Sequence, residues 1–282
     1  MEKKDAAAFD EAAERELVKA AMPVSKRCDP SLLPLRAGRV CKTHVLLPPD
    51  EYQDQSMGRV LSDRETMAHL PFMVSSKGIA TSYARIRRKD RDIWQAQNKT
   101  HLNYSIAVKR SQIPAHALDK INEDEFLPPR KVQVDDGEID VDEPYLVVGC
   151  CGLNHIEYPH HVAEAGIILD ARFWRSGICT ESMYMVFKFG FGVLKLHRIG
   201  IVTAGKNDGM RGWMEKAAGV DVESIKKDAL YDMDSDKYMD FWEYAVFDNQ
   251  WCESIEQRLR ARIEKGPHAT IVASVASNFP SS

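Results

Sequence analysis

The run AGIILDARFWRSGICTESMYMVFKFGFGVL, residues 165–194, joins an apolar stretch to a longer apolar stretch through a short polar turn. After the turn, Met183, Phe187, Phe191 and Leu194 recur at the spacing of one helical face. Before it, the apolar residues are continuous, as in a strand buried on both faces. A buried strand that leads directly into a buried helix predicts a mixed α/β core.

The turn between them has the composition of an anion site. A helix N-terminus presents unsatisfied N–H groups and the positive end of the helix dipole. Gly177 lets backbone approach a ligand closely, and Arg175 adds positive charge. Ser176 and Thr180 add hydroxyl groups, but either is also an ordinary helix cap. The turn has neither the spacing of a Walker loop nor that of a GxGxxG loop. The turn alone therefore fits a phosphate-binding loop and an ordinary helix cap equally well.

Further strands and helices surround this run. Strands are predicted for THVLL, NYSIAVK, PYLVVGCCGLNHI, HVAEAGIILD and HRIGIVTA, the third and fourth forming an antiparallel pair. Two consecutive helices are predicted after Pro49, with Asp50 and Asp63 as N-caps. Downstream, Asn207 and Gly219 bound a helix, a hairpin covers about residues 222–248, and a basic, exposed helix follows.

Composition limits the partners and the location. The chain has 282 residues, 28% of them charged, and a formal net charge of 38 − 42 = −4. No global positive field attracts nucleic acid, and no run approaches the ~20 apolar residues of a membrane span. The charged N-terminus lacks an apolar signal core, so a cytoplasmic location is expected. Six scattered cysteines favour reduced thiols over disulfides.

The predicted domain organisation has three parts. Residues 1–42 hold an amphipathic helix at 8–21 and a connector. Residues 43–265 form the α/β domain, with an acidic, Pro-rich insertion at 110–143 that contains a hairpin. Residues 266–282 form a flexible tail.

A set of residues in a fixed order carries a family resemblance: Gly166, Leu169, Trp174, Gly177, Thr180-Glu181, His197-Arg198, Asn207, Gly219, Tyr244 and Trp251. In order and spacing they resemble the GNAT superfamily of acetyl-CoA-dependent N-acetyltransferases, within it the branch of ribosomal-protein N-terminal alanine and serine acetyltransferases. The resemblance covers roughly residues 43–252. It implies a mixed, mostly antiparallel central sheet flanked by helices.

The resemblance also implies a cofactor, acetyl-CoA, with CoA as the product. Backbone amides from Arg175 to Thr180 are expected to hold the pyrophosphate, and a splayed strand is expected to pair with the pantetheine arm through its backbone. Asn207 resembles a cofactor contact and is also a plain N-cap. The cofactor-binding set is therefore Ile168, Leu169, Trp174, Arg175, Ser176, Gly177, Ile178, Cys179, Thr180 and Asn207. Cys179 stands where the family has Gly or Ala, and a thiol beside a helix N-terminus is expected to be unusually reactive.

Acetyl transfer to an amine needs proton removal from nitrogen and a proton for the departing thiolate. The resemblance implies Glu164 as the base or substrate-orienting carboxylate, because the branch commonly has Glu two residues before the glycine that is Gly166 here. Strand alternation points its side chain toward the face of Gly166, and a structural or solvated Glu is the alternative. Met210 replaces the serine that many relatives use as the acid, which leaves Tyr184, water or an unaided thiolate. Tyr244 is expected in the core, with a place beside the substrate as the alternative.

Two further patterns do not lead to a metal prediction. His155, His160 and His161 have spacing that fits a tetrahedral site poorly. The segment DMDSDKYMDFWE matches calcium-loop acids, but it has Lys237 at the turn glycine and fits an acidic hairpin turn better.

The predicted activity is acetyl transfer in a ternary complex to a primary amine, with a protein or peptide N-terminus favoured as the acceptor. A small amine such as a polyamine, an amino acid or a xenobiotic is the alternative. A non-catalytic acyl-CoA binder that docks partners through its terminal helices, and a homodimer, also remain open. The insertion at 110–143 is expected near the acceptor.

Overall fold

The computed structural model describes residues 31, 33, 38–70, 73, 81–232 and 235–266. The predicted helix at 8–21 lies outside these residues, as does the predicted tail beyond Gly266. None of the helices in the described part of the chain has both the length and the apolar character needed to cross a membrane.

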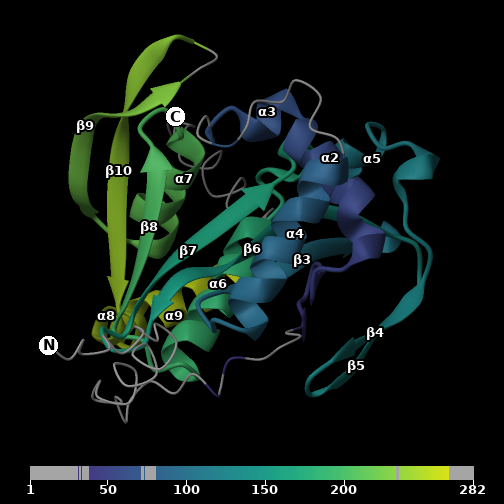
Figure 1. Ribbon diagram of the computed structural model, residues 1–282, viewed down its shortest axis with the longest axis horizontal. Helices are drawn as coiled ribbons and strands as arrows, with labels where there is room; N and C mark the ends of the chain where they lie inside the picture. Colours follow the sequence, from purple (N-terminus) through teal and green to yellow (C-terminus); the bar gives the residue numbers. More distant parts are fainter. Residues whose placement is uncertain are drawn as a thin grey trace, which may run out of the picture.

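Within the described residues, eight strands form one mixed sheet in the order β1-β2-β3-β6-β7-β8-β10-β9 (Figure 1). Only the β7–β8 pair in this sheet is parallel. The predicted mostly antiparallel sheet is therefore confirmed. The strands are β1 Arg39–Val40, β2 Val45–Leu47, β3 Leu102–Lys109, β6 Tyr145–Glu157, β7 Val162–Leu169, β8 Arg198–Ala204, β9 Val222–Asp232 and β10 Lys237–Phe247.

Helices cover both faces of the sheet. The α-helices are α2 Asp54–Ser62, α3 Arg64–Met67, α4 Thr81–Ala96, α5 Ala115–Leu118, α6 Ile178–Gly192, α7 Asp208–Gly212, α8 Asp248–Gln250 and α9 Glu256–Lys265. Cys150 of β6 packs with residues of α2, α3 and α4, whereas its neighbour Cys151 packs with residues of α6. Alternation along β6 therefore places α2 and α4 on one face and α6 on the other, as Figure 1 shows.

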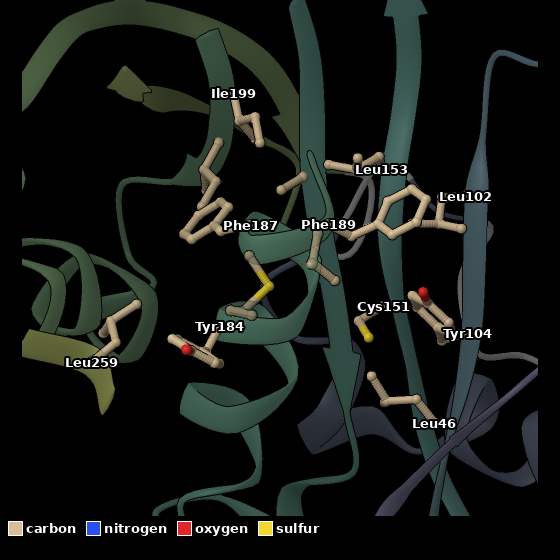
Figure 2. Close-up of a cluster of buried hydrophobic side chains, with 14 of the residues drawn as sticks. Leu46, Leu102, Tyr104, Cys151, Leu153, Tyr184, Phe187, Phe189, Ile199 and Leu259 are labelled. Atoms are coloured by element: carbon tan, nitrogen blue, oxygen red, sulfur yellow. The ribbon is translucent and has the colours of Figure 1, made fainter. Parts of the chain in front are cut away.

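The larger core lies between the sheet and α6. Phe187 of α6 is fully buried and faces the sheet near Ile199 of β8 (Figure 2). The basic helix at the C-terminal end joins this core, because Trp251 and Leu259 are also buried and Trp251 stacks on Phe191 with ring centroids 5.7 Å apart. The prediction that this helix is exposed is therefore wrong for one of its faces.

Local chemistry sets several element boundaries as predicted. The Asp50 carboxylate accepts a hydrogen bond from Tyr52 N at 3.1 Å, and that of Asp63 accepts one from Thr66 N at 2.7 Å. Gly219 ends the helical segment after α7 with φ of 77°. Both aspartate caps and the glycine stop are therefore confirmed.

Two elements differ from prediction. The sheet begins with β1 at Arg39, ahead of the predicted boundary at residue 43. The sequence does not predict helix α4. Its buried residues are Ala84 and Gln95, which do not form the apolar stripe that indicates an amphipathic helix. The predicted hairpins do form, as β4 (Arg130–Val134) with β5 (Gly137–Val141), and as β9 with β10.

Candidate active site

The candidate site begins where β7 and β8 separate. These strands pair in parallel at Val162–Arg198, Ala163–Ile199 and Glu164–Gly200. Beyond Glu164, both strands are described to their ends without a further pair, and β7 slants away from β8 (Figure 1). The edge of β7 from Ala165 to Leu169 therefore faces an opening rather than a neighbouring strand.

A cavity of about 580 Å³ lies at the wider end of this opening. Its walls come from five places in the sequence: the segment from Thr66 to Leu70, the end of β7, the turn into α6, the segment from Asn207 to Ala217, and Arg262 of α9. Eight of the ten predicted cofactor-binding residues line it, namely Ile168, Leu169, Trp174, Arg175, Gly177, Cys179, Thr180 and Asn207. The other two, Ser176 and Ile178, are buried beneath the turn.

Left-handed backbone shapes the turn before α6. Arg175 has φ of 62° and Gly177, the N-cap of α6, has φ of 91°. Trp174 Nε1 donates to Leu169 O at 2.8 Å, which ties the turn back to the end of β7. Ser176 Oγ donates to Phe173 O at 2.6 Å and accepts from Ile178 N at 3.4 Å, a weak cap. The first turn of α6 thus begins at the cavity wall, where its N–H groups suit an anion.

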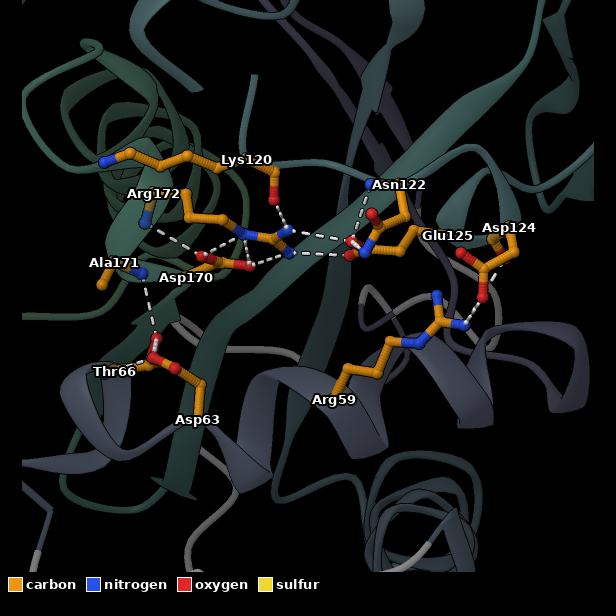
Figure 3. Close-up of polar contacts among 10 residues, drawn as sticks. All are labelled: Arg59, Asp63, Thr66, Lys120, Asn122, Asp124, Glu125, Asp170, Ala171 and Arg172. Atoms are coloured by element: carbon orange, nitrogen blue, oxygen red, sulfur yellow. Dashed lines mark hydrogen bonds and ion pairs between the residues drawn. The ribbon is translucent and has the colours of Figure 1, made fainter. Parts of the chain in front are cut away.

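An ion-pair network holds the end of β7 in place (Figure 3). The Arg172 guanidinium donates to Asp170 at 2.7 Å and to Glu125 at 2.9 Å. Burial raises the pKa of Glu125, but hydrogen bonds from Arg172 and Asn122 outweigh it, so the net pKa lies below the ordinary value. Glu125 belongs to the 110–143 insertion, which therefore braces the turn from outside.

Positive charge beside the large cavity was only partly predicted. Lys216 and Arg262 line it together with Arg175, and all three side chains are exposed. Lys216 follows α7, whereas Arg262 belongs to α9. No spacing in the sequence relates them to the turn, so only their position in the fold could identify them.

His69 is another residue of this cavity that the sequence did not indicate. Its ring stacks on that of Trp174, with centroids 6.1 Å apart. Burial, helped by the positive charge of Lys206 and opposed by Asp208, lowers the pKa of His69. Its Nδ1 is buried without a hydrogen-bond partner among the described residues, which leaves one polar atom beside the cavity for a ligand.

A second cavity of about 250 Å³ continues from the first along the opening between the strands. The two cavities share Leu70, Ile167, Ile168, Asn207 and Met210. The predicted base Glu164 lines the second cavity, with its side chain 52% exposed and Oε2 3.7 Å from His155 Nδ1. Glu164 and the cofactor-binding set therefore meet around one continuous opening.

Asn207 and Met210 lie at the junction of the two cavities. Asn207 Oδ1 accepts from Met210 N at 3.1 Å, so its N-cap role is present, and its Nδ2 donates to Thr203 Oγ1 at 3.0 Å. Met210 has no proton to donate at this position.

The two candidate tyrosines lie elsewhere. Tyr184 faces α9 and its hydroxyl donates to Glu256 Oε1 at 3.3 Å, whereas neither cavity has Tyr184 in its wall. Tyr184 therefore lies outside the walls of both cavities. Tyr244 is 1% exposed and donates to Glu215 Oε1 at 2.7 Å, as expected of a core tyrosine.

Two other expectations find no support in the structure. Burial raises the pKa of the Cys179 thiol to about 12, so the neutral thiol is favoured despite the nearby helix N-terminus, against the expectation of unusual reactivity. The insertion at 110–143 is described throughout, and none of its residues lines either cavity. Arg87 and Arg91 of α4 line the second cavity instead. Among the described residues, no group of three His, Cys, Asp or Glu side chains is arranged to hold a metal ion.

Comparison with known proteins identifies the fold and the family. A family model described as an acetyltransferase (GNAT) domain matches residues 44–219. No curated protein matches the chain in sequence. Among solved structures, Mycobacterium smegmatis RimJ in complex with CoA-disulfide is 15% identical, with a TM-score of 0.57 over 81% of this chain and 96% of that one.

Two more solved structures have the same fold. The ribosomal-protein-S5-alanine acetyltransferase from Vibrio fischeri is 13% identical, with a TM-score of 0.55 over 76% of this chain and 98% of that one. The microcin C7 self-immunity acetyltransferase MccE, in complex with acetyl-CoA and AMP, is 14% identical, with a TM-score of 0.52 over 73% of this chain and 93% of that one. At these identities the likeness establishes the fold.

Proposed function

Because the chain belongs to the GNAT acetyltransferase family, we propose that this acyltransferase moves an acetyl group from acetyl-CoA to a primary amine at a protein or peptide N-terminus. The observation that carries the proposal is the opening between β7 and β8, which joins the turn before α6 to the cavity that contains Glu164.

The large cavity fits the cofactor. Its volume, its open strand edge and the N-terminus of α6 suit a long ligand with a pantetheine arm and a pyrophosphate. Arg175, Lys216 and Arg262 supply positive charge for the phosphates. Bound there, acetyl-CoA supplies an activated acetyl thioester.

The second cavity suits the acceptor amine. Direct attack in a ternary complex is supported by the residues shared between the two cavities, since both substrates then meet at one place. The amine nitrogen forms a bond to the acetyl carbon while the carbon–sulfur bond breaks. Glu164, directly or through water, takes a proton from nitrogen, and water supplies the proton that the thiolate gains.

A peptide N-terminus is favoured because two of the structural neighbours are RimJ and an S5-alanine acetyltransferase. A small free amine is the second candidate, because a cavity of about 250 Å³ is large enough for one.

The proposal is tested by calorimetry and by a substrate panel. Acetyl-CoA is titrated into the purified protein, and CoA release is then followed with peptides of varied N-termini and with free amines. We expect binding and faster turnover of peptides. No binding at millimolar acetyl-CoA would contradict the proposal, and turnover of free amines alone would move it to the second candidate.

A further inference from the structure

Two arginines of α4 contribute the positive charge of the second cavity. Arg87 and Arg91 are both half-buried and stand four residues apart, on one face of the helix. Building on the proposed function, we propose that the acceptor carries an anionic group, a carboxylate or a phosphate, that binds Arg87 and Arg91 while its amine lies toward Glu164.

Arg87 and Arg91 differ from the neighbouring arginines of α4 in their interaction partners. Arg85 and Arg88, on the same helix, form ion pairs with the buried carboxylate of Asp54 at 3.5 and 2.8 Å. Within the described residues, Arg87 and Arg91 have no carboxylate at ion-pair distance: Arg87 donates to Tyr83 Oη at 3.3 Å, and Arg91 donates to Cys150 Sγ at 3.5 Å.

The sequence of the segment that leads into α4 offers no acidic side chain. Residues 71–80 read PFMVSSKGIA and contain no aspartate or glutamate. A partly buried guanidinium without a counter-charge is costly, and its planar fork matches the two oxygens of a carboxylate or phosphate. An anionic ligand would supply the partner that the described residues do not place there.

The charged residues of the second cavity also match a ligand that carries one positive and one negative group. Its charged residues are Arg87, Arg91 and Glu164, and its other lining residues are neutral. Glu164 favours an ammonium or amine, and the two arginines favour an anion. Of these two cavities, Arg87 and Arg91 line the second alone, whereas three other basic side chains line the large one.

Arg91 and Glu164 lie beside different positions along β6. Arg91 contacts Cys150, whereas Glu164 pairs across the sheet with Asn154, four residues farther along β6. Four residues of strand span ~13 Å. This length separates two backbone positions on β6, and the side chains of Arg91 and Glu164 both line the cavity beside them. The cavity therefore has room for an amine and an acid separated by several bonds, as in a peptide with Asp or Glu close to its N-terminus.

The test measures the acetylation of acidic and neutral acceptors by the wild type and by charge variants of α4. Peptide amides beginning Ala-Asp, Ala-phosphoserine and Ala-Asn are assayed, together with free aspartate against asparagine. We expect kcat/KM for Ala-Asp to exceed that for Ala-Asn by about tenfold, equivalent to ~1.4 kcal/mol. The Arg87→Gln/Arg91→Gln double variant should lose most of this preference, Arg91→Lys should keep part of it, and Lys89→Gln, an exposed charge on the same helix, should keep it fully.

The free amino acids and the phosphopeptide separate the sources of the anion. An arginine-dependent preference for free aspartate would assign the anion to a small amine, and one for phosphoserine would assign it to a phosphate. Equal turnover of acidic and neutral acceptors, or a preference that survives the double variant, would overturn the anion site.

A binding measurement separates this inference from the proposed function. The acetylated Ala-Asp and Ala-Asn peptides, which are the expected products, are titrated in the presence of CoA into the wild type and Arg87→Gln. Tighter, arginine-dependent binding of the Asp product without any acetyl transfer would support the anion site and contradict the proposed function. Acetyl transfer with equal binding of both products would support the proposed function and contradict the anion site. Equal binding of both products without acetyl transfer would contradict the anion site and the proposed function alike.

Discussion

The Glu164 carboxylate combines access to solvent with a place in the second cavity, the proposed acceptor site. If it takes the proton from the amine, Glu164→Gln should lower kcat by about 10²-fold, the low end of general base catalysis, and leave acetyl-CoA affinity unchanged. Steady-state kinetics and calorimetry check both parts. Glu157→Gln is the matched control, since Glu157 is exposed on β6 and lines neither cavity. An unchanged kcat in Glu164→Gln would remove it from the base role.

Gly177 has a positive φ and lines the large cavity, so the backbone conformation of the turn and the space in the cavity both depend on it. Gly177→Trp should abolish acetyl-CoA binding, because the indole would occupy the cavity and the left-handed backbone disfavours a side chain. Gly192→Trp is the control at the opposite end of α6, where an added Cβ meets no atom within 4 Å. Calorimetry measures binding and circular dichroism confirms folding. Retained binding in Gly177→Trp would place the pyrophosphate elsewhere.

Two helical segments, α9 and the one after α7, bring charge to the large cavity that the sequence did not reveal. Lys216→Gln/Arg262→Gln should weaken acetyl-CoA binding by about tenfold, because each side chain lies where a phosphate can accept its hydrogen bonds. The loss should shrink as salt concentration rises, since both groups are exposed. Lys265→Gln, an exposed charge on α9, is the control. Equal affinities at low salt would show that neither residue binds the cofactor.

The packing of the molecule also sets a pH dependence through two buried histidines. Burial lowers the pKa of His44, against an opposing effect of Glu181, and burial with the positive charges of His155 and Arg91 lowers that of His101 to about 4. Between pH 6.5 and 4 the unfolded chain therefore binds protons that the folded chain does not, so stability falls as pH falls.

For His101, the expected loss of unfolding free energy from pH 7.5 to pH 5 is roughly 2 kcal/mol. Urea denaturation at the two pH values measures it. His101→Phe should lose less stability than the wild type over this range, whereas His116→Phe, at an exposed site, should match the wild type. An identical pH slope in His101→Phe would mean that His101 ionises normally in the folded state.

Prediction from the sequence succeeded where the controlling interactions are local. Apolar periodicity placed β7 and α6, and Asp50, Asp63 and Asn207 marked helix starts because each caps a backbone N–H two or three residues away. It failed for α4, whose charged residues are held by contacts such as that of Arg88 with Asp54, 34 residues away.

By itself, the sequence determined the strand, the turn and the helix that make the cofactor side of the opening, together with the position of Glu164 on β7. The tertiary structure decided which charges face the two cavities. It turned Tyr184 toward α9 and brought Arg262 beside the turn. Within the part of the chain that the structure describes, it left Arg87 and Arg91 without the carboxylate that their neighbours share. The physical reason is that backbone preferences act over a few residues, whereas the pairing of a charge depends on elements that meet only when the sheet is assembled.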